Sequence, residues 1–392
     1  MNFEMPNSQS SADEKKEEDI EKKEREAVPQ TCAELLLIFK EKSTLPKFEQ
    51  NFTDTDTEQD LAHTESGKES ADSPVAKKLS FEGVGDRDVY NVAPFATEWE
   101  EKEEGLVLVI GRAERRGTCE NPELHFFEEK NDGTWVKIKD TPVLPLEDGF
   151  ATNIGQEMIV GGVTAYPNPN ESDPRRIDYH MVFYRDRGKG LAELEEFTQG
   201  PELMKDIRLV ELPNGRIAAF TRPTGGDNGK GKMAYIELDG LDEVNPEKLA
   251  QAKVIESQFV RGEWGGANQL YPLPDGRIGV LGHIACIDEP LPDEKKGHRH
   301  YYAVSFIYDP KNQETTPLEI IATRKNFPKG EAKNTDLQDV VFAGGMVRHG
   351  DGKATLYVGL SDAEAGCIEI DDPFWKVEQV CKAKQEAVNE VG

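Results

Sequence analysis

Carboxylates that could exchange a proton with a substrate stand at the ends of short apolar segments in this sequence. They are Glu114, Asp148, Asp206, Asp339 and Asp362. Asp148 is the strongest candidate for a general acid, because apolar neighbours and a glycine in segment 146–150 could exclude water and keep its carboxyl protonated. An ordinary Asp-Gly turn explains the same residues, and their spacing alone favours that turn.

Cationic and histidine side chains form a second set beside apolar segments. They are Arg112, Lys205, Arg208, Arg222, His283, Arg299 and His300. In a chain with a formal net charge of −28, the set as a whole indicates a pocket for an anion, although any single member could instead pair with a carboxylate such as Asp206. No cysteine or acidic residue lies at a recognisable ligand spacing from the triplet 298–300, so we predict neither a metal nor a cofactor.

The segment 264–268 offers chemistry that suits a sugar. Trp264 beside two glycines presents a flat apolar face, and Asn268 could hydrogen-bond to hydroxyl groups. A tryptophan is also a common core residue, so the segment supports sugar binding without establishing it.

Short β-strands must position all of these side chains. Five times along the chain, a turn leads into an apolar segment that ends in small, polar or charged residues, at 104–114, 155–164, 214–223, 275–284 and 351–362. Repeats at intervals of roughly 50–75 residues fit radial blades of about four strands each. The sequence therefore predicts an all-β, five-bladed propeller whose strand ends meet around one cavity. A pair of β-sandwiches is the alternative, and it gives no reason for that convergence.

Composition divides the 392 residues into three parts. Residues 1–80 are acidic and poor in aromatic residues, so we expect a disordered leader with one short helix near 31–42, where Thr31 and Glu34 form a capping box. That helix could pack on the main domain, which we favour, or dock a protein partner. Residues 81–376 form the predicted catalytic propeller, and residues 377–392 form a tail.

Charge and cysteine content restrict the partners and the compartment. The net charge of −28 argues against a nucleic-acid partner. The five cysteines include no CxxC pair, the N-terminus has no signal-peptide pattern, and no apolar run is long enough to cross a bilayer. These features favour a cytoplasmic protein without membrane contact.

Six motifs taken together resemble a known family. They lie, in this order, at 204–209, 220–223, 263–268, 281–285, 299–302 and 361–365. They resemble the family long described as domain of unknown function 1861, whose characterised members are dual mannosyltransferase/phosphorylases of glycosyltransferase family 108. The resemblance spans about residues 88–375, and its specificity comes from the ordered set rather than from any one motif.

That family is similar to the β-mannoside phosphorylases of glycoside hydrolase family 130, which are five-bladed propellers. The resemblance implies that Asp148 is the general acid and that Arg112 belongs to a sugar-binding motif. It also implies that Arg222 and His283 lie near phosphate. One difference stands out: Gly149-Phe150 follows Asp148 where the phosphorylases have Pro-Arg, so the contacts of that arginine must come from elsewhere.

The resemblance implies an inverting β-mannoside phosphorylase or mannosyltransferase that forms or uses α-mannose 1-phosphate. A phosphorylase needs only one acid, because phosphate is already an anionic nucleophile. We expect sugar contacts from Asn91, Arg112, Glu114, Asp206, Trp264, Asn268 and Asp362. We expect contacts with inorganic phosphate or GDP-mannose from Lys205, Arg208, Arg222, His283, Arg299, His300 and Tyr301. A non-catalytic sugar-binding or scaffold propeller and a plain glycosidase remain alternatives.

Overall fold

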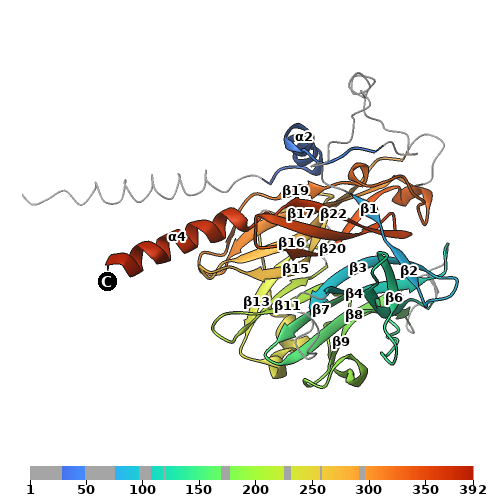
Figure 1. Cartoon of the computed structure of the whole chain (residues 1–392), viewed down its shortest axis with the longest axis horizontal. Helices are drawn as coiled ribbons and strands as arrows, with labels where there is room; N and C mark the ends of the chain where they lie inside the picture. The colour runs from blue at the N-terminus through green and yellow to red at the C-terminus, as the bar shows by residue number, and fades with distance from the viewer. Residues whose placement is uncertain are drawn as a thin grey trace, which may run out of the picture.

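The computed structural model of the chain describes residues 29–48, 76–96, 107–117, 121–168, 177–224, 231–256, 258–290 and 296–391. β-Strands, nearly all of them in antiparallel pairs, make up about half of these residues (Figure 1). The expected disorder of the leader concerns residues that lie mostly outside the described ones. Strands begin at Lys77, slightly before the expected domain start at residue 81.

Tight turns of one repeated kind lead into several strands. Asn214, Asp275 and Asp351 each accept a hydrogen bond, at 2.9–3.1 Å, from the backbone N–H two residues later. The intervening glycine has φ between 79° and 95°, a left-handed conformation that glycine adopts without a steric penalty. These side chain-capped turns explain why the recurrent Asn-Gly and Asp-Gly pairs mark the strand starts.

The strands form three separate sheets and one larger one. The first sheet contains β2 (Ser80–Glu82), β3 (Asp88–Ala96), β4 (Val107–Glu114), β5 (Glu123–Glu129) and β6 (Thr134–Lys137). The second contains β7 (Glu147–Ile154), β8 (Glu157–Pro167), β9 (Ile177–Arg185) and β10 (Glu195–Gln199). The third contains β11 (Lys205–Glu211), β12 (Ile217–Arg222), β13 (Ala234–Leu238) and β14 (Lys253–Val254).

The nine-stranded sheet consists of two antiparallel groups. One group contains β15 (Trp264–Pro272), β16 (Ile278–Ile287), β17 (Arg299–Asp309), β18 (Glu314–Thr315) and β19 (Glu319–Ala322). The other contains β20 (Asp339–Arg348), β21 (Lys353–Leu360), β22 (Glu364–Asp371) and β1 (Lys77–Lys78). In the part of the chain that the structure describes, one short parallel pairing of β17 with β20, at His300↔Asp339 and Tyr301↔Val340, joins the two groups.

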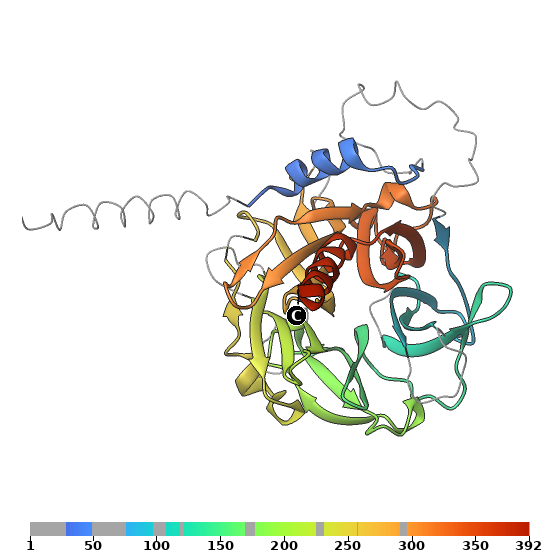
Figure 2. The ribbon, with the colours of Figure 1, turned by 60° about the vertical axis from the view of Figure 1, so that its left-hand side comes forward.

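Apolar side chains fill the spaces between successive groups. We number the three smaller sheets as groups one to three and the two halves of the nine-stranded sheet as groups four and five. One cluster of buried residues lies between each group and the next, and a fifth cluster lies between group five and group one. The leading strands β3, β7, β11, β15 and β20 also contact one another in this order, and β20 contacts β3. Figure 2 shows the groups following one another in chain order around the molecule. Burial on both faces accounts for the almost continuous apolar character of these strands.

Two longer helices lie outside the sheets. Helix α2 (Cys32–Lys42) has the capping box that Thr31 and Glu34 predict, and it buries Cys32 and Leu35 against the third and fourth groups. This packing agrees with the favoured of the two interpretations of the leader helix. Helix α4 (Trp375–Val391) follows the last strand. The remaining helical segments are one-turn elements: α3 (Pro246–Leu249) and the 3₁₀ turns Leu191–Glu193, Leu241–Glu243, Arg324–Asn326 and Thr335–Leu337. No helix among the described residues is both long and apolar enough to span a membrane.

Candidate active site

Three leading strands present a short polar side chain from the same unusual backbone conformation. Asn91 in β3, Asp148 in β7 and Asp206 in β11 have φ of 48°, 48° and 54°. Each lies within a β-bulge, where the pairing with the next strand shifts register. Asn and Asp tolerate this left-handed region better than other residues with a β-carbon, and such conformations concentrate at functional sites. The bulges therefore direct three equivalent side chains out of the strand ladder.

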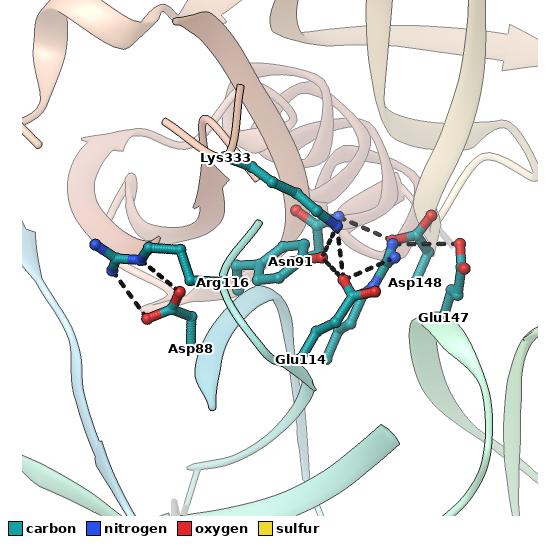
Figure 3. Close-up of polar contacts among 9 residues, drawn as sticks. Asp88, Asn91, Glu114, Arg116, Glu147, Asp148 and Lys333 are labelled. Atoms are coloured by element: carbon teal, nitrogen blue, oxygen red, sulfur yellow. Dashed lines mark hydrogen bonds and ion pairs between the residues drawn. The ribbon is translucent and has the colours of Figure 1, made fainter. Parts of the chain in front are cut away.

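Asp148 is the centre of a buried polar network (Figure 3). Asn91 donates a hydrogen bond from Nδ2 to Asp148 Oδ1 at 2.8 Å, and Arg112 Nη1 lies 3.2 Å from the same oxygen. Arg112 Nη1 is also 3.3 Å from Glu147 Oε2, and its guanidinium lies over the ring of Tyr90. Glu147 and Tyr90 immediately precede predicted residues, but the sequence analysis assigned neither of them a role.

The carboxyl of Asp148 is ionised in the isolated chain. Burial alone would raise its pKa, but Arg112, Lys205 and the hydrogen bond from Asn91 together hold the pKa below its ordinary value. The expectation that exclusion of water keeps this carboxyl protonated is therefore wrong for the isolated chain. Burial does raise the pKa of Asp362, where the charge of Asp148 acts in the same direction.

Glu114 joins this network to a lysine that the sequence analysis missed. Its Oε2 lies 3.1 Å from Arg112 Nη2 and 2.7 Å from Lys333 Nζ, and the hydroxyl of Tyr90 donates to it. Lys333 Nζ also donates to the Tyr90 hydroxyl at 3.1 Å, and the Lys333 side chain is only 7% exposed. Figure 3 shows Lys333 reaching toward Asn91 and Glu114, with the Asp88–Arg116 pair farther away. Lys333 lies in the connection before β20 and belongs to no motif, so only the fold places it here.

A second buried network surrounds Asp206. Arg222 Nη1 is 2.5 Å from Asp206 Oδ2, and His283 Nε2 is 3.9 Å from the same oxygen. Asn268 Oδ1 contacts His283 Nδ1 at 2.9 Å. A β-carbon at Gly266 would lie 2.6 Å from Asp206 Oδ2, so this close approach requires glycine in the Trp264–Asn268 motif.

The pKa values in this second network differ from those of isolated groups. Burial lowers the pKa of His283 to about 3, and the charge of Asp206 offsets this only in part, so the imidazole is neutral. For Asp206 the balance is reversed, because Arg222 and the neighbouring cations outweigh burial and hold its pKa far below the ordinary value. Tyr301 stacks on His283 with ring centroids 5.6 Å apart, and Trp264 donates from Nε1 to the Tyr301 hydroxyl at 3.1 Å. The indole therefore forms part of the wall behind this network.

Lys205 connects the two networks. It precedes Asp206 in β11 and pairs in register with Arg222 of β12. Its charge lowers the pKa values of Asp148, Asp206 and Asp362 together, which places it among all three carboxylates. Strands β3, β7, β11, β15 and β20 all line a small central cavity of about 40 Å³ beside these residues.

Several buried polar atoms of the two networks have no hydrogen-bond partner among the described residues. They are Asn91 Oδ1, Arg112 Nε, Glu114 Oε1, Arg222 Nε, Asn268 Nδ2 and His283 Nε2. A buried polar atom without a partner costs roughly 1–3 kcal/mol. All six belong to side chains that the sequence analysis selected, and together they indicate a site for a polar ligand.

Three predicted cations lie elsewhere or are otherwise engaged. Arg208 donates to the backbone carbonyls of Asn268 and Ile207, so its guanidinium bonds within the fold. His300 lies 2.8 Å from carboxylate oxygens of Asp288 and of Asp339, on the other face of β17 from Tyr301, because side chains alternate along a strand.

Arg299 lies at the start of β17, with its Nε 3.5 Å from Asp336 Oδ2. Among the described residues, no group of three or more His, Cys, Asp or Glu side chains is arranged to hold a metal ion.

Known proteins resemble this chain in sequence and in fold. The model of the family described as Protein of unknown function (DUF1861) matches residues 67–376. A mannose phosphorylase from Leishmania mexicana, solved in complex with phosphate ion, is 33% identical with a TM-score of 0.67, over 78% of this chain and 90% of that one. A GDP-Man-dependent mannosyltransferase from the same organism is 31% identical with a TM-score of 0.66, over 76% of this chain and 90% of that one. No match was found among curated protein sequences.

Proposed function

This chain belongs to the DUF1861 family, and on that premise we propose that it is an enzyme of the mannoside phosphorylase and mannosyltransferase kind. The observation that carries the proposal is the position of one carboxylate, Asp148, beside Lys205 and the network of Asp206, Arg222 and His283. One acid–base group next to a cationic site suits phosphorolysis, in which phosphate replaces the second carboxylate of a glycosidase.

The finer proposal is an inverting reaction on β-1,2-mannosides. Phosphate attacks the anomeric carbon, the bond to the glycosidic oxygen breaks, and Asp148 gives its proton to that oxygen, directly or through a sugar hydroxyl. The products are α-mannose 1-phosphate and a shortened mannoside. In the reverse direction, or with GDP-mannose as the donor, ionised Asp148 accepts the proton of the attacking hydroxyl.

The low pKa of Asp148 fits this scheme when the charge of phosphate is included. The ionised carboxyl of the isolated chain is the form that the synthetic direction needs. Phosphate bound beside Lys205 offsets the effect of that cation and adds negative charge, and both changes raise the pKa of a nearby carboxyl. The proton needed for phosphorolysis is thus taken up together with phosphate.

The two networks divide the remaining roles. Arg222, neutral His283, Lys205 and Tyr301 surround the proposed phosphate position. The unpaired Arg222 Nε supplies a hydrogen-bond donor there. His283 donates from Nδ1 to Asn268 Oδ1, so its unpaired Nε2 is an acceptor for the hydroxyl of a protonated phosphate. The sugar contacts come from Asn91, Arg112, Glu114, Asp206, Trp264, Asn268 and Asp362. We also propose that the five strand groups are the five blades of a propeller, which the cyclic order of the apolar clusters supports.

An activity screen separates this proposal from its alternatives. Purified protein is incubated with β-1,2-mannobiose, with and without inorganic phosphate, and separately with GDP-mannose and a mannose acceptor. We expect mannose 1-phosphate only when phosphate is present, or extended mannosides from GDP-mannose. Free mannose without phosphate would identify a glycosidase, and sugar binding without turnover of either donor would identify a non-catalytic module.

A further inference from the structure

Two cysteines from distant parts of the chain meet where the leader helix packs on group four. Cys32 is the first residue of α2 and is 2% exposed. Cys286 is the last but one residue of β16 and lies, partly buried, in the same apolar cluster. The two thiols are hydrogen-bonded to each other, and both are free. Sulfur atoms in such contact need only a small rotation of their side chains to reach bonding distance.

A charged histidine lies beside this pair. His300 of β17 is in register with Cys286, and residues directly opposite each other in a sheet project from the same face. Burial lowers the pKa of His300, but Asp339 and Asp288 raise it to about 9, so the imidazole is a cation at neutral pH. The other ionisable groups that act on the two thiols or are acted on by them are Glu263, Asp288, Tyr302 and Asp339.

The two thiols differ in reactivity. The hydrogen bond from Cys32 lowers the pKa of Cys286, and the charge of His300 adds to this effect, against that of burial. The same hydrogen bond and burial raise the pKa of Cys32. A thiolate attacks a disulfide, whereas a thiol does not, and Cys286 is also the more exposed of the two. Cys286 is therefore suited to react first, and Cys32 to react with the product.

We propose that Cys32 and Cys286 form a reversible disulfide that fastens α2 to group four. The oxidant is a small-molecule disulfide, RSSR. The thiolate of Cys286 attacks one sulfur of RSSR and releases RS⁻, which leaves a mixed disulfide. Cys32 then gives its proton to that RS⁻ and attacks the sulfur of Cys286. The second RS⁻ leaves and takes up the proton that Cys286 had given to the solvent. Two protein thiols are oxidised, and RSSR is reduced to two thiols.

The disulfide strengthens a contact that the helix already makes beside the active site. The backbone N–H of Cys32 donates at 2.6 Å to Oε1 of Glu263, the residue before Trp264. Ala285, the neighbour of Cys286, is in register with both Trp264 and Tyr301. The new bond therefore joins α2 to the strands that carry the wall behind the second network. It forms whichever reaction the site catalyses.

Peptide mapping of the full chain tests the disulfide. The reduced protein is incubated with oxidised glutathione at neutral pH, remaining thiols are trapped with N-ethylmaleimide, and tryptic peptides are identified without reductant. We expect a linked pair of peptides that contain Cys32 and Cys286, and dithiothreitol should separate them. Cys32→Ser should instead accumulate glutathione on Cys286, because the resolving thiol is gone. Cys286→Ser should leave Cys32 unmodified, because Cys32 is buried.

Cys367→Ser and Cys381→Ser are the matched controls. Cys367 is buried in another apolar cluster and Cys381 lies in α4, so both variants should form the link in the same yield as the unaltered chain. Absence of the link in the unaltered chain would overturn the inference. A mixed disulfide that persists on Cys286 while Cys32 is present, or links to other cysteines in comparable yield, would overturn it as well.

Discussion

Replacing Asp148 by asparagine tests the proposed chemistry most directly. The amide has nearly the same shape, and its oxygen can still accept hydrogen bonds from Asn91 and Arg112, whose donors lie 2.8 and 3.2 Å from the present carboxylate oxygen. The amide cannot take up or release a proton at neutral pH. The substitution therefore removes acid–base function while it keeps the local geometry.

The expected loss of activity is much larger than the expected loss of stability. General acid–base catalysis contributes about 10²–10⁴-fold, so kcat for phosphorolysis should fall by about 10³-fold. Arg112 keeps its contacts with Glu114 at 3.1 Å and with Glu147 at 3.3 Å. Loss of one charge-assisted contact costs about 1–3 kcal/mol, and relief of repulsion between Asp148 and Asp362 offsets part of it.

Release of mannose 1-phosphate from β-1,2-mannobiose is the assay, with thermal unfolding followed in parallel. Asp186→Asn is the matched control. Asp186 is completely buried, but among the described residues its carboxylate accepts hydrogen bonds only from the backbone N–H groups of residues 158, 188 and 190. That control should lose stability and keep the kcat of its folded fraction. Retention of more than a tenth of kcat in Asp148→Asn would refute the reasoning. If Asp362→Asn were inactive at the same time, the acid would be Asp362, whose pKa is already raised.

Three further substitutions test the phosphate site, a partly buried ion pair and the leader helix. Arg222→Ala should raise KM for phosphate or GDP-mannose by about 10- to 100-fold, because it removes a cation that binds the phosphate group. The KM of the acceptor should change much less. Equal changes of the two KM values in initial-rate measurements would contradict the assignment. Burial lowers the pKa of His300, but Asp339 and Asp288 outweigh it and raise the pKa to about 9. The ion pairs of His300 with these carboxylates therefore stabilise the fold fully below pH 6.5, and this contribution is lost as the pH rises through 9. Chemical unfolding at pH 6 and pH 10 should show a difference on the order of 3 kcal/mol that disappears in His300→Ala; an unchanged pH dependence would exclude the charged histidine. Leu35→Ala should cost about 2–4 kcal/mol of local stability and expose α2 to proteolysis, because Leu35 is buried. Leu37→Ala is the control, at a residue that is 60% exposed, and should have neither effect. Equal cleavage of the two variants would show that Leu35 does not anchor the helix.

Local patterns in the sequence were sufficient for the β class and for most of the residues that the structure brings together. Asn-Gly and Asp-Gly pairs predict tight turns because their side chains and φ preferences act within a few residues. Polar residues at the strand starts predict Asn91, Asp148 and Asp206, because each must leave a strand that is otherwise apolar. The capping box at Thr31 predicts α2 for the same local reason.

Charge states could not be predicted in this way. Asp148 looks like a desolvated acid beside Gly149, yet Arg112 from another strand and Lys205 from another sheet lower its pKa. His283 becomes neutral because the fold buries it completely. Each of these shifts depends on distances between residues far apart in the chain, and Coulomb energies fall with distance rather than with sequence separation.

The sequence by itself determined the alternation of turns and apolar strands, the polar ends of those strands and the family to which the chain belongs. Only the tertiary structure decided which polar ends meet, bringing Lys333 to Glu114 and leaving His300 with Asp288 and Asp339. The physical reason is that turn and strand preferences act over neighbouring residues, whereas the partners of a buried charge are chosen by packing between sheets.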